Sequence, residues 1–320
     1  MSDSKPTTDT SLQPEPAPES NLVYQAICKL LSGQDGEART ERRSKRTHQS
    51  VDWQAFTPDE WQILAQMAEA EGVASLLHWK LDPVRNETIF PIPANVRDFF
   101  RRSYEQSAMR NAVLLQELEG ILATFGKAEL PTIVLKGAAL AQTLYPDPGL
   151  RPMGDLDLLV RAEALTRAIQ LLQTRGYTDE RVSDCTCLRG GPEGQVEVAM
   201  HGSLVPDGQG RSPDLDWLWG QTLLFPTQKA GRFAQYLQPE AQFVYQCGHL
   251  MIQTERSRRR LIWFYDLYLL YRQHLQATDW AALFEAEATA GWAVWMQSAL
   301  YELRDLFGVQ LPPELTGYSA

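Results

Sequence analysis

The feature that most constrains this chain is a short apolar segment that runs directly into a glycine. Thr132–Lys136 is rich in β-branched and apolar residues and follows Pro131, so it predicts a buried strand. After Gly137, the Ala- and Leu-rich segment Ala138–Tyr145 predicts a short helix. The first turn of a helix has free backbone N–H groups, which can bind a phosphate. The segment therefore predicts a strand, a glycine turn and an anion-binding helix start.

Two carboxylates open the next apolar segment, Asp155–Val160. Residues two apart in a strand share a face, so Asp155 and Asp157 are expected to point in the same direction. Two like charges so placed repel each other unless a cation lies between them. Mg²⁺ suits the pair because it binds carboxylate and phosphate oxygens. The two segments together indicate phosphoryl or nucleotidyl transfer.

These residues also carry a resemblance. Leu135-Lys136-Gly137, followed by Arg151-Pro-Met-Gly-Asp155-Leu-Asp157-Leu-Leu-Val160, resembles the core motif of an uncharacterised bacterial nucleotidyltransferase family. The likeness is specific over residues 132–201, and the flanking helices extend it from about residue 21 to about residue 311. It implies an α+β fold, in which a nucleotidyltransferase-like mixed β-sheet core is flanked by N-terminal and C-terminal helical regions. It also implies a nucleotidyltransferase that uses Mg²⁺ or Mn²⁺ to transfer a nucleoside monophosphate from an NTP.

The resemblance assigns roles to individual residues. Asp155, Asp157 and Glu197 become the catalytic and metal-binding carboxylates. The nucleotide-binding candidates are Lys136, Gly137, Ala138, Arg151 and His201. The backbone N–H groups of Gly137 and Ala138 would contact the phosphates. The side chains of Lys136 and Arg151 would clamp the same phosphates. Two alternatives stay open: the lysine could pair with a carboxylate instead, and the histidine could simply end its strand.

The third acid departs from the family pattern. The family's motif usually ends in an Asp-Leu-His-Trp sequence, whereas this chain has Ala199-Met200-His201-Gly202. Glu197 lies on the same strand face, but two residues correspond to about 6–7 Å along a strand. Either Glu197 acts as the third metal ligand or general base, or the third acid is missing. In the second case the protein is a nucleotide-binding or regulatory module of the same fold.

A small-molecule kinase is a further alternative, because it needs the same metal and phosphate contacts. Neither a Gly-x-x-x-x-Gly-Lys-Ser/Thr loop nor a His-Arg-Asp catalytic loop occurs in the sequence, so this alternative ranks third. The acceptor is open: a small molecule, a peptide hydroxyl or an RNA end would each fit.

The chain divides into four predicted regions. Residues 1–20 are polar and expected to be disordered. Residues 21–128 form a helical region with a basic linker, residues 129–235 the nucleotidyltransferase-like core, and residues 236–320 a C-terminal helical region. The linker carries five basic residues between 39 and 46, which favour a solvated segment over an RNA contact because no aromatic residue lies among them.

Periodicity predicts the elements outside the motif. A helix is expected from a Thr57 capping box to Gly72. Further helices are expected over Asn21–Leu31, Val73–Leu81, Ile92 to about Phe125, Arg161–Gly176, Phe243–Gln253, Leu261–His274, Trp280–Thr289 and Trp292–Phe307. Strands are expected over Asp184–Leu188 and Gln195–His201. The basic run Arg256–Arg260 is either a solvated cluster or one wall of the nucleotide cleft. His249 and Asp266 occupy positions that are polar in the resembled family.

Charge and cysteine content limit the class of protein. The formal net charge is −10, which argues against general DNA or RNA binding because phosphate contacts need an electropositive face. The four cysteines are scattered and lack a Cys-x-x-Cys motif. No signal peptide or long apolar run is present. The expectation is a soluble cytoplasmic protein with no membrane partner.

Overall fold

The computed structural model describes residues 18–33, 51–84, 90–182, 185–204, 214–227, 231–255, 259–286 and 291–316. The predicted disorder of the first residues, most of the basic linker and the first three residues of the 256–260 run lie outside this part of the chain. Within it, no helix is long and apolar enough to cross a membrane.

A mixed seven-stranded sheet forms the centre of the described structure, in the order β3-β4-β5-β2-β1-β7-β6. Its strands are β1 (Thr132–Leu135), β2 (Leu156–Leu159), β3 (Thr178–Val182), β4 (Cys185–Gly190), β5 (Val196–His201), β6 (Thr222–Leu224) and β7 (Ala234–Leu237). The central strand β2 runs antiparallel to β1 and parallel to β5. β1 also pairs in parallel with β7, and the other pairings are antiparallel. The sheet confirms the predicted mixed β-sheet core.

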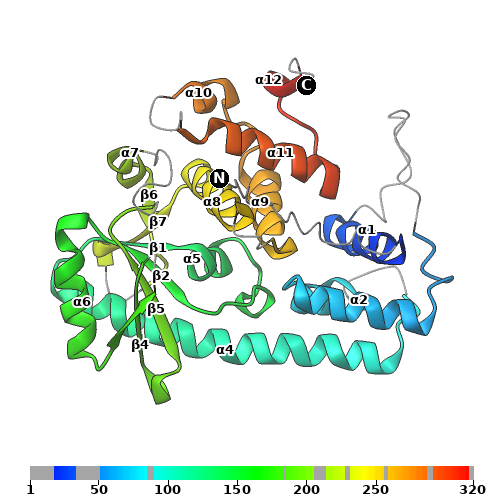
Figure 1. Cartoon of the computed structure of the whole chain (residues 1–320), viewed down its shortest axis with the longest axis horizontal. Coiled ribbons are helices and arrows are strands. Elements are labelled where there is room, and N and C mark those ends of the chain that lie inside the picture. The colour runs from blue at the N-terminus through cyan, green and yellow to red at the C-terminus, as the bar shows by residue number, and fades with distance from the viewer. Residues whose placement is uncertain are drawn as a thin grey trace, which may run out of the picture.

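Helices precede, interrupt and follow the sheet (Figure 1). They are α1 (Pro18–Ser32), α2 (Pro58–Ala70), α3 (Ala74–Lys80), α4 (Ala94–Lys127), α5 (Lys136–Thr143), α6 (Leu165–Thr174), α7 (Leu215–Gly220), α8 (Pro239–Glu255), α9 (Leu261–His274), α10 (Trp280–Glu285), α11 (Ala293–Phe307) and α12 (Pro313–Thr316), with 3₁₀ turns η1 (Pro148–Leu150), η2 (Ala162–Ala164), η3 (Pro192–Gly194) and η4 (Gly231–Phe233). The long helix α4 extends from beneath the sheet to the N-terminal helices, so it joins the two halves of the molecule (Figure 1).

The predicted helix start at Thr57 is confirmed. The Glu60 backbone N–H donates to the Thr57 hydroxyl oxygen at 3.2 Å, and the Thr57 backbone N–H donates to the Glu60 carboxylate at 2.7 Å. This reciprocal pair satisfies two backbone donors that a helix start otherwise leaves open.

The N-terminal and C-terminal helices share one apolar core, which includes buried residues of α1, α2, α8, α9 and α11. Polar contacts link the same two regions: the Tyr268 hydroxyl donates to the Ser32 carbonyl at 3.0 Å, and the Leu261 N–H donates to the Glu71 carboxylate at 2.6 Å. A second core packs α4, α5 and α6 against the sheet. This packing holds α8 and α9 beside the predicted motif, although both helices follow it well along the chain.

Three strands were not anticipated. β3 reads Thr-Asp-Glu-Arg-Val, and its polar residues hide the strand pattern because β3 lies at the edge of the sheet. β6 and β7 are only three and four residues long, too short to show alternation. They extend the sheet beyond β1.

Candidate functional site

A cleft of about 500 Å³ lies where the predicted motif meets the C-terminal helices. This volume is in the range of about 300–1,000 Å³ that is usual for small-molecule and cofactor sites. One side, here called the sheet wall, consists of Lys136, Gly137, Arg151, Gly154, Asp155, Asp157 and Glu197. The other, the helical wall, consists of Gln246, His249, Gln253, Arg260 and Trp263. The structure therefore brings six of the eight predicted site residues into one cavity lining.

Asp157 is the buried centre of the sheet wall. It lies on β2 between Leu135 of β1 and Ala199 of β5, and its side chain is only 3% exposed. Its Oδ1 accepts a hydrogen bond from Lys136 Nζ at 2.7 Å and lies 2.8 Å from His201 Nε2. Burial alone would raise the pKa of this carboxyl group, but the attraction of both partners outweighs burial and lowers it. Asp157 is therefore a carboxylate at neutral pH.

Lys136 occupies a strained position between β1 and α5. Its φ is +47°, a left-handed conformation that costs a residue with a β-carbon about 1–2 kcal/mol. Burial would lower the pKa of its ammonium group, but the Asp157 charge outweighs burial and raises it. The lysine thus stays charged and pairs with a carboxylate, which was one of the two alternatives left open by the sequence.

Asp155 differs from its neighbour because it has no hydrogen-bond or ion-pair partner among the described residues. The Asp157 charge and, second, burial raise the pKa of Asp155 to about 6. An unpaired carboxylate crowded by another is the environment that a divalent cation would relieve. The donor set of Asp155 and Asp157 therefore fits Mg²⁺, which protein sites commonly hold with one or two carboxylates while water and substrate phosphates complete the shell.

Glu197 lies beside Asp155 rather than beside Asp157. The register pairs Leu156 with Val198, so the preceding residues of these two parallel strands, Asp155 and Glu197, are neighbours. The negative charge of Glu197 also contributes to the raised pKa of Asp155. The glutamate is 38% exposed and lies 3.4 Å from Arg189 Nη2. The sheet wall thus has an accessible third acid next to Asp155.

Ala199 stands directly opposite Asp157 and is buried, so the position of the expected family aspartate is filled by a methyl group. Among the described residues, no three His, Cys, Asp or Glu side chains form a group that could hold a metal ion. The metal-ligand role of Glu197 stays a prediction.

Arg151 has a structural partner. Its Nη2 donates to Asp266 Oδ2 at 2.8 Å, and the Tyr145 hydroxyl donates to Asp266 Oδ1 at 2.6 Å. Asp266 is fully buried, so this network ties the segment before β2 to α9. Asp266 is thus the partner of the predicted phosphate clamp, although the clamp role itself stays a prediction.

Gly137 is required by the close approach of Arg151. A β-carbon at this position would lie 2.7 Å from Arg151 Nη1 and 3.1 Å from Met153 Cγ. Among the described residues, no side chain caps the start of α5, whose N-cap residue is Leu135. Its first backbone N–H groups, including that of the predicted residue Ala138, therefore have no side-chain acceptor.

The helical wall was largely missed from the sequence. Gln246, His249 and Gln253 of α8 all line the cleft, and their spacing of three and four residues places them on one helix face. Gln246 is buried, and its Oε1 has no hydrogen-bond partner in the described structure. Burial and, second, the Lys136 charge lower the pKa of His249 to about 3, so this ring is neutral. The sequence did contain one pattern that could have identified this wall, namely polar residues three and four positions apart in an otherwise apolar helix.

Trp263 supplies the aromatic surface of the helical wall. Its ring lies edge-on to His249 with centroids 5.6 Å apart. Arg260 lines the cleft nearby, in agreement with one of the two readings of the basic run, whereas Arg259 donates to Glu302 at 2.9 Å. The helical wall therefore combines amides, a neutral imidazole, an indole and one guanidinium.

The fold and the paired carboxylates define a nucleotidyltransferase-like protein. Residues 57–308 match the family described as "Uncharacterised nucleotidyltransferase", and the chain belongs to this family. Family membership supports nucleotidyl transfer as the general class of chemistry. Among solved structures, an antigenic nucleotidyltransferase-like protein from Paracoccidioides brasiliensis is similar at 16% identity and a TM-score of 0.39, over 64% of this chain and 91% of that one. A search of curated proteins finds no match.

Proposed function

We propose that the protein is an Mg²⁺- or Mn²⁺-dependent nucleotidyltransferase that transfers a nucleoside monophosphate from an NTP to a hydroxyl-bearing acceptor. The observation that carries this proposal is the unpaired Asp155 carboxylate beside the ionised Asp157, in the same cleft as Gly137 of the first turn of α5.

Asp155 and Asp157 would hold the cation. When bound, it neutralises the charge that develops on the phosphates in the transition state. Lys136 and His201 keep Asp157 ionised and fixed in position. Because these partners already orient one carboxylate, the less constrained Asp155 is the one that adjusts to the cation.

The NTP would lie between the two walls. The backbone N–H groups of Gly137 and Ala138 face phosphate oxygens at the start of α5, and the positive charges of Lys136 and Arg260 lie in the same cavity lining. Trp263 offers a flat ring for a base, and stacking of a base on an aromatic side chain contributes about 1–3 kcal/mol. The neutral amides of Gln246 and Gln253 can donate to and accept from base edges.

Glu197 would accept the proton of the acceptor hydroxyl. Its accessible position next to Asp155 suits a general base, a role that contributes about 10²–10⁴-fold to a rate. In this account Ala199 is a buried strand residue, and the acid serves from Glu197, two residues to its N-terminal side on the same face.

A binding or regulatory module is the second candidate, and Ala199 opposite Asp157 is the observation that favours it. A protein that only holds nucleotide would need the phosphate contacts and the carboxylate pair but no proton acceptor. Its distinguishing property is nucleotide binding without turnover.

The test is incubation of the full chain with each NTP, Mg²⁺ or Mn²⁺ and cell extract, with radiolabel at either the α or the γ phosphate. Transfer of the α label to an extract component, with loss when Asp157→Asn replaces the wild type, is the expected result. Transfer of the γ label would identify a kinase instead. Saturable binding of NTP without transfer of either label would identify the binding module.

A further inference from the structure

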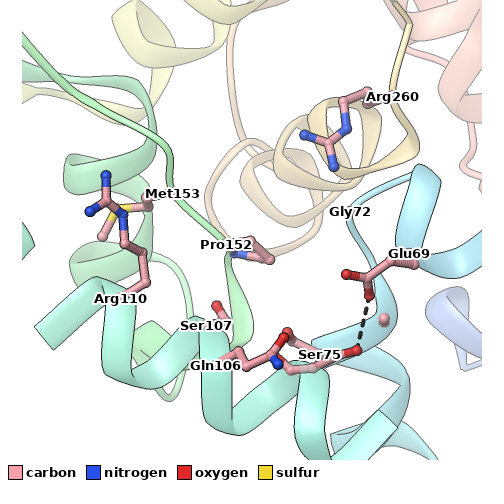
Figure 2. Close-up of a pocket in the computed structure, with 11 residues that line it drawn as sticks. Glu69, Gly72, Ser75, Gln106, Ser107, Arg110, Pro152, Met153 and Arg260 are labelled. Carbon is pink, nitrogen blue, oxygen red and sulfur yellow. Dashed lines mark hydrogen bonds between the residues drawn. The ribbon is translucent and has the colours of Figure 1, made fainter. Parts of the chain in front are cut away.

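A second pocket, here called the serine pocket, adjoins the cleft and has a volume of about 220 Å³. It lies between α2, α3, α4 and the segment before β2 (Figure 2). Its lining includes Glu69, Ser75, Ser107, Arg110, Met153 and Arg260. This volume is below the range of about 300 Å³ and above that suits drug-sized ligands, so it fits a molecule of one small ring.

The serine pocket and the cleft share a wall. Arg260 lines both, while Met153 faces the serine pocket and Gly154 the cleft. Met153 also lies close to Gly137, and Arg110 Nη2 donates to the Gly154 carbonyl at 3.0 Å. The two pockets therefore adjoin at Arg260 and at the Met153–Gly154 segment, so a ligand in the serine pocket would lie next to the cleft.

Ser107 points to a ligand. It is 8% exposed, and its hydroxyl oxygen has no hydrogen-bond partner in the described structure. In Figure 2, Ser107 and Arg110 rise from α4 toward Pro152 and Met153. A buried hydroxyl without a hydrogen-bond partner is destabilising, and a polar ligand would remove that cost.

The other two serines around the pocket are already satisfied. The Ser75 hydroxyl donates to the Ser103 carbonyl at 3.2 Å, and the Ser103 hydroxyl donates to Glu69 Oε2 at 2.9 Å. Ser107 is therefore the serine of this pocket that is left for a ligand to pair.

The remaining polar groups define what that ligand carries. Glu69 accepts one hydrogen bond from Ser103 and retains further acceptor sites. Arg260 uses its Nε on the Ala70 carbonyl at 3.2 Å and keeps other N–H groups. The lining thus offers a carboxylate that accepts hydrogen bonds, guanidinium groups that donate them and a hydroxyl group that can do either. A ligand that matches this lining needs groups that both donate and accept hydrogen bonds, as hydroxyl groups do.

We propose that the serine pocket is the acceptor subsite and that the acceptor is a small polyhydroxylated ring, of the monosaccharide or cyclitol class. This inference rests on the proposed nucleotidyl transfer. One ring hydroxyl oxygen forms a bond to the α-phosphorus, the bond between that phosphorus and the β-phosphate oxygen breaks, and pyrophosphate leaves. The hydroxyl proton passes to Glu197. The product is a ring carrying a nucleoside monophosphate.

The test measures binding of D-glucose, D-galactose, D-glucosamine and myo-inositol to the full chain by saturation-transfer NMR, in the presence of Mg²⁺ and a non-hydrolysable ATP analogue. We expect saturable binding of at least one ring. Ser107→Met, which fills the pocket, should weaken that binding tenfold or more. Ser107→Ala, which removes only the hydroxyl, should weaken it about 2–10-fold. Ala112→Met places the same side chain on an exposed part of α4 and should have no effect.

Two outcomes overturn the proposal: no ring binds to the wild type, or a ring binds and neither Ser107 variant weakens it. If Ser107→Met does not fold, the Ser107→Ala result decides. Affinity for the ATP analogue, measured in the same samples, separates this test from that of the proposed function. Failure of the rings with the ATP analogue still bound rejects only the acceptor class, whereas failure of the wild type to bind the analogue rejects nucleotidyl transfer.

Discussion

The two walls of the cleft differ in chemistry and in origin. The sheet wall carries two aspartates, a glutamate, a lysine and an arginine from residues 136–197, and it is built on β2, β5, the start of α5 and the segment before β2. The helical wall carries mostly neutral polar and aromatic side chains from residues 246–263 of α8 and α9. Charge concentrated on one side and neutral recognition groups on the other suggest a division of labour: the sheet wall performs the chemistry and the helical wall selects the nucleotide.

The largest effect is expected at Asp157. Asp157→Asn removes the carboxylate that Lys136 and His201 hold in place, and we expect kcat for α-phosphate transfer to fall about 10³-fold or more, since electrostatic groups at a reacting centre contribute on this scale. The matched control is Glu163→Gln, which neutralises an exposed acid near the end of β2. Steady-state transfer rates measure both, and activity within threefold of the wild type in Asp157→Asn would contradict the role of the sheet wall.

The next prediction tests whether Glu197 serves as the third acid or whether the chain lacks a third acid because Ala199 takes its place. Glu197→Gln should lower kcat about 10²-fold or more, as expected for a lost general base, whereas Ala199→Asp should leave activity unchanged or lower it because it adds a buried acid opposite Asp157. The comparison is made in one transfer assay with both variants and the wild type. A silent Glu197→Gln together with activity gained by Ala199→Asp would show that the natural chain lacks its third acid.

A smaller effect is expected on the helical wall. Trp263→Ala should raise the KM for the NTP about tenfold, within the contribution of one stacked base, with kcat changed much less. Trp263→Phe should restore most of the affinity. Trp295→Ala serves as the control because this ring of α11 packs at a tilt against Trp292, the N-cap residue of that helix, and does not line the cleft. A loss in kcat at constant KM would place Trp263 with the chemistry and break the division between the walls.

The smallest effect concerns stability. The folded-state pKa of Asp155 is about 6, above its unfolded value of about 3.9, so ionisation of this group destabilises the fold as pH rises through this window. In metal-free buffer, Asp155→Asn should therefore increase the free energy of unfolding at pH 7 by about 1–3 kcal/mol. The gain should vanish below about pH 4, where the carboxyl group is protonated in both states.

Urea denaturation at pH 4 and pH 7 with excess EDTA measures this gain, and Glu163→Gln again provides the comparison. An equal gain at both pH values would mean that charge repulsion is not its cause. Loss of stability at pH 7 would mean that Asp155 has a stabilising partner.

The sequence predicted the sheet wall better than the helical wall for a physical reason. Alternation in a strand places Asp155 and Asp157 on one face without knowledge of the rest of the fold. The structure confirms the mixed core, and the match to the family model confirms the family. The position of Glu197 depends on which strands pair and in what register. Alternation along a strand determines which face Glu197 lies on, but not which residue of the adjacent strand lies beside it. The strand pairing and its register therefore had to come from the structure.

The helical wall needed information that local patterns do not contain. Gln246 and Trp263 face the cleft because the N-terminal and C-terminal helices share one core, a contact between segments some 200 residues apart. Asp266 was noted only as a polar position, and its pairing partner Arg151 lies 115 residues away in the sequence. Short polar edge strands such as β3 were missed because their residues do not alternate.

The most direct test of the account measures ATP affinity by calorimetry with and without Mg²⁺, in the wild type and in the double variant Asp155→Asn, Asp157→Asn. If the two aspartates hold the cation that joins the triphosphate to the sheet wall, Mg²⁺ should strengthen binding to the wild type about tenfold or more, equivalent to about 1.4 kcal/mol. This enhancement should disappear in the double variant, while its weak metal-free binding is kept or improved because charge repulsion is removed. Binding by the double variant with unaltered Mg²⁺ dependence would contradict the assignment of the metal site.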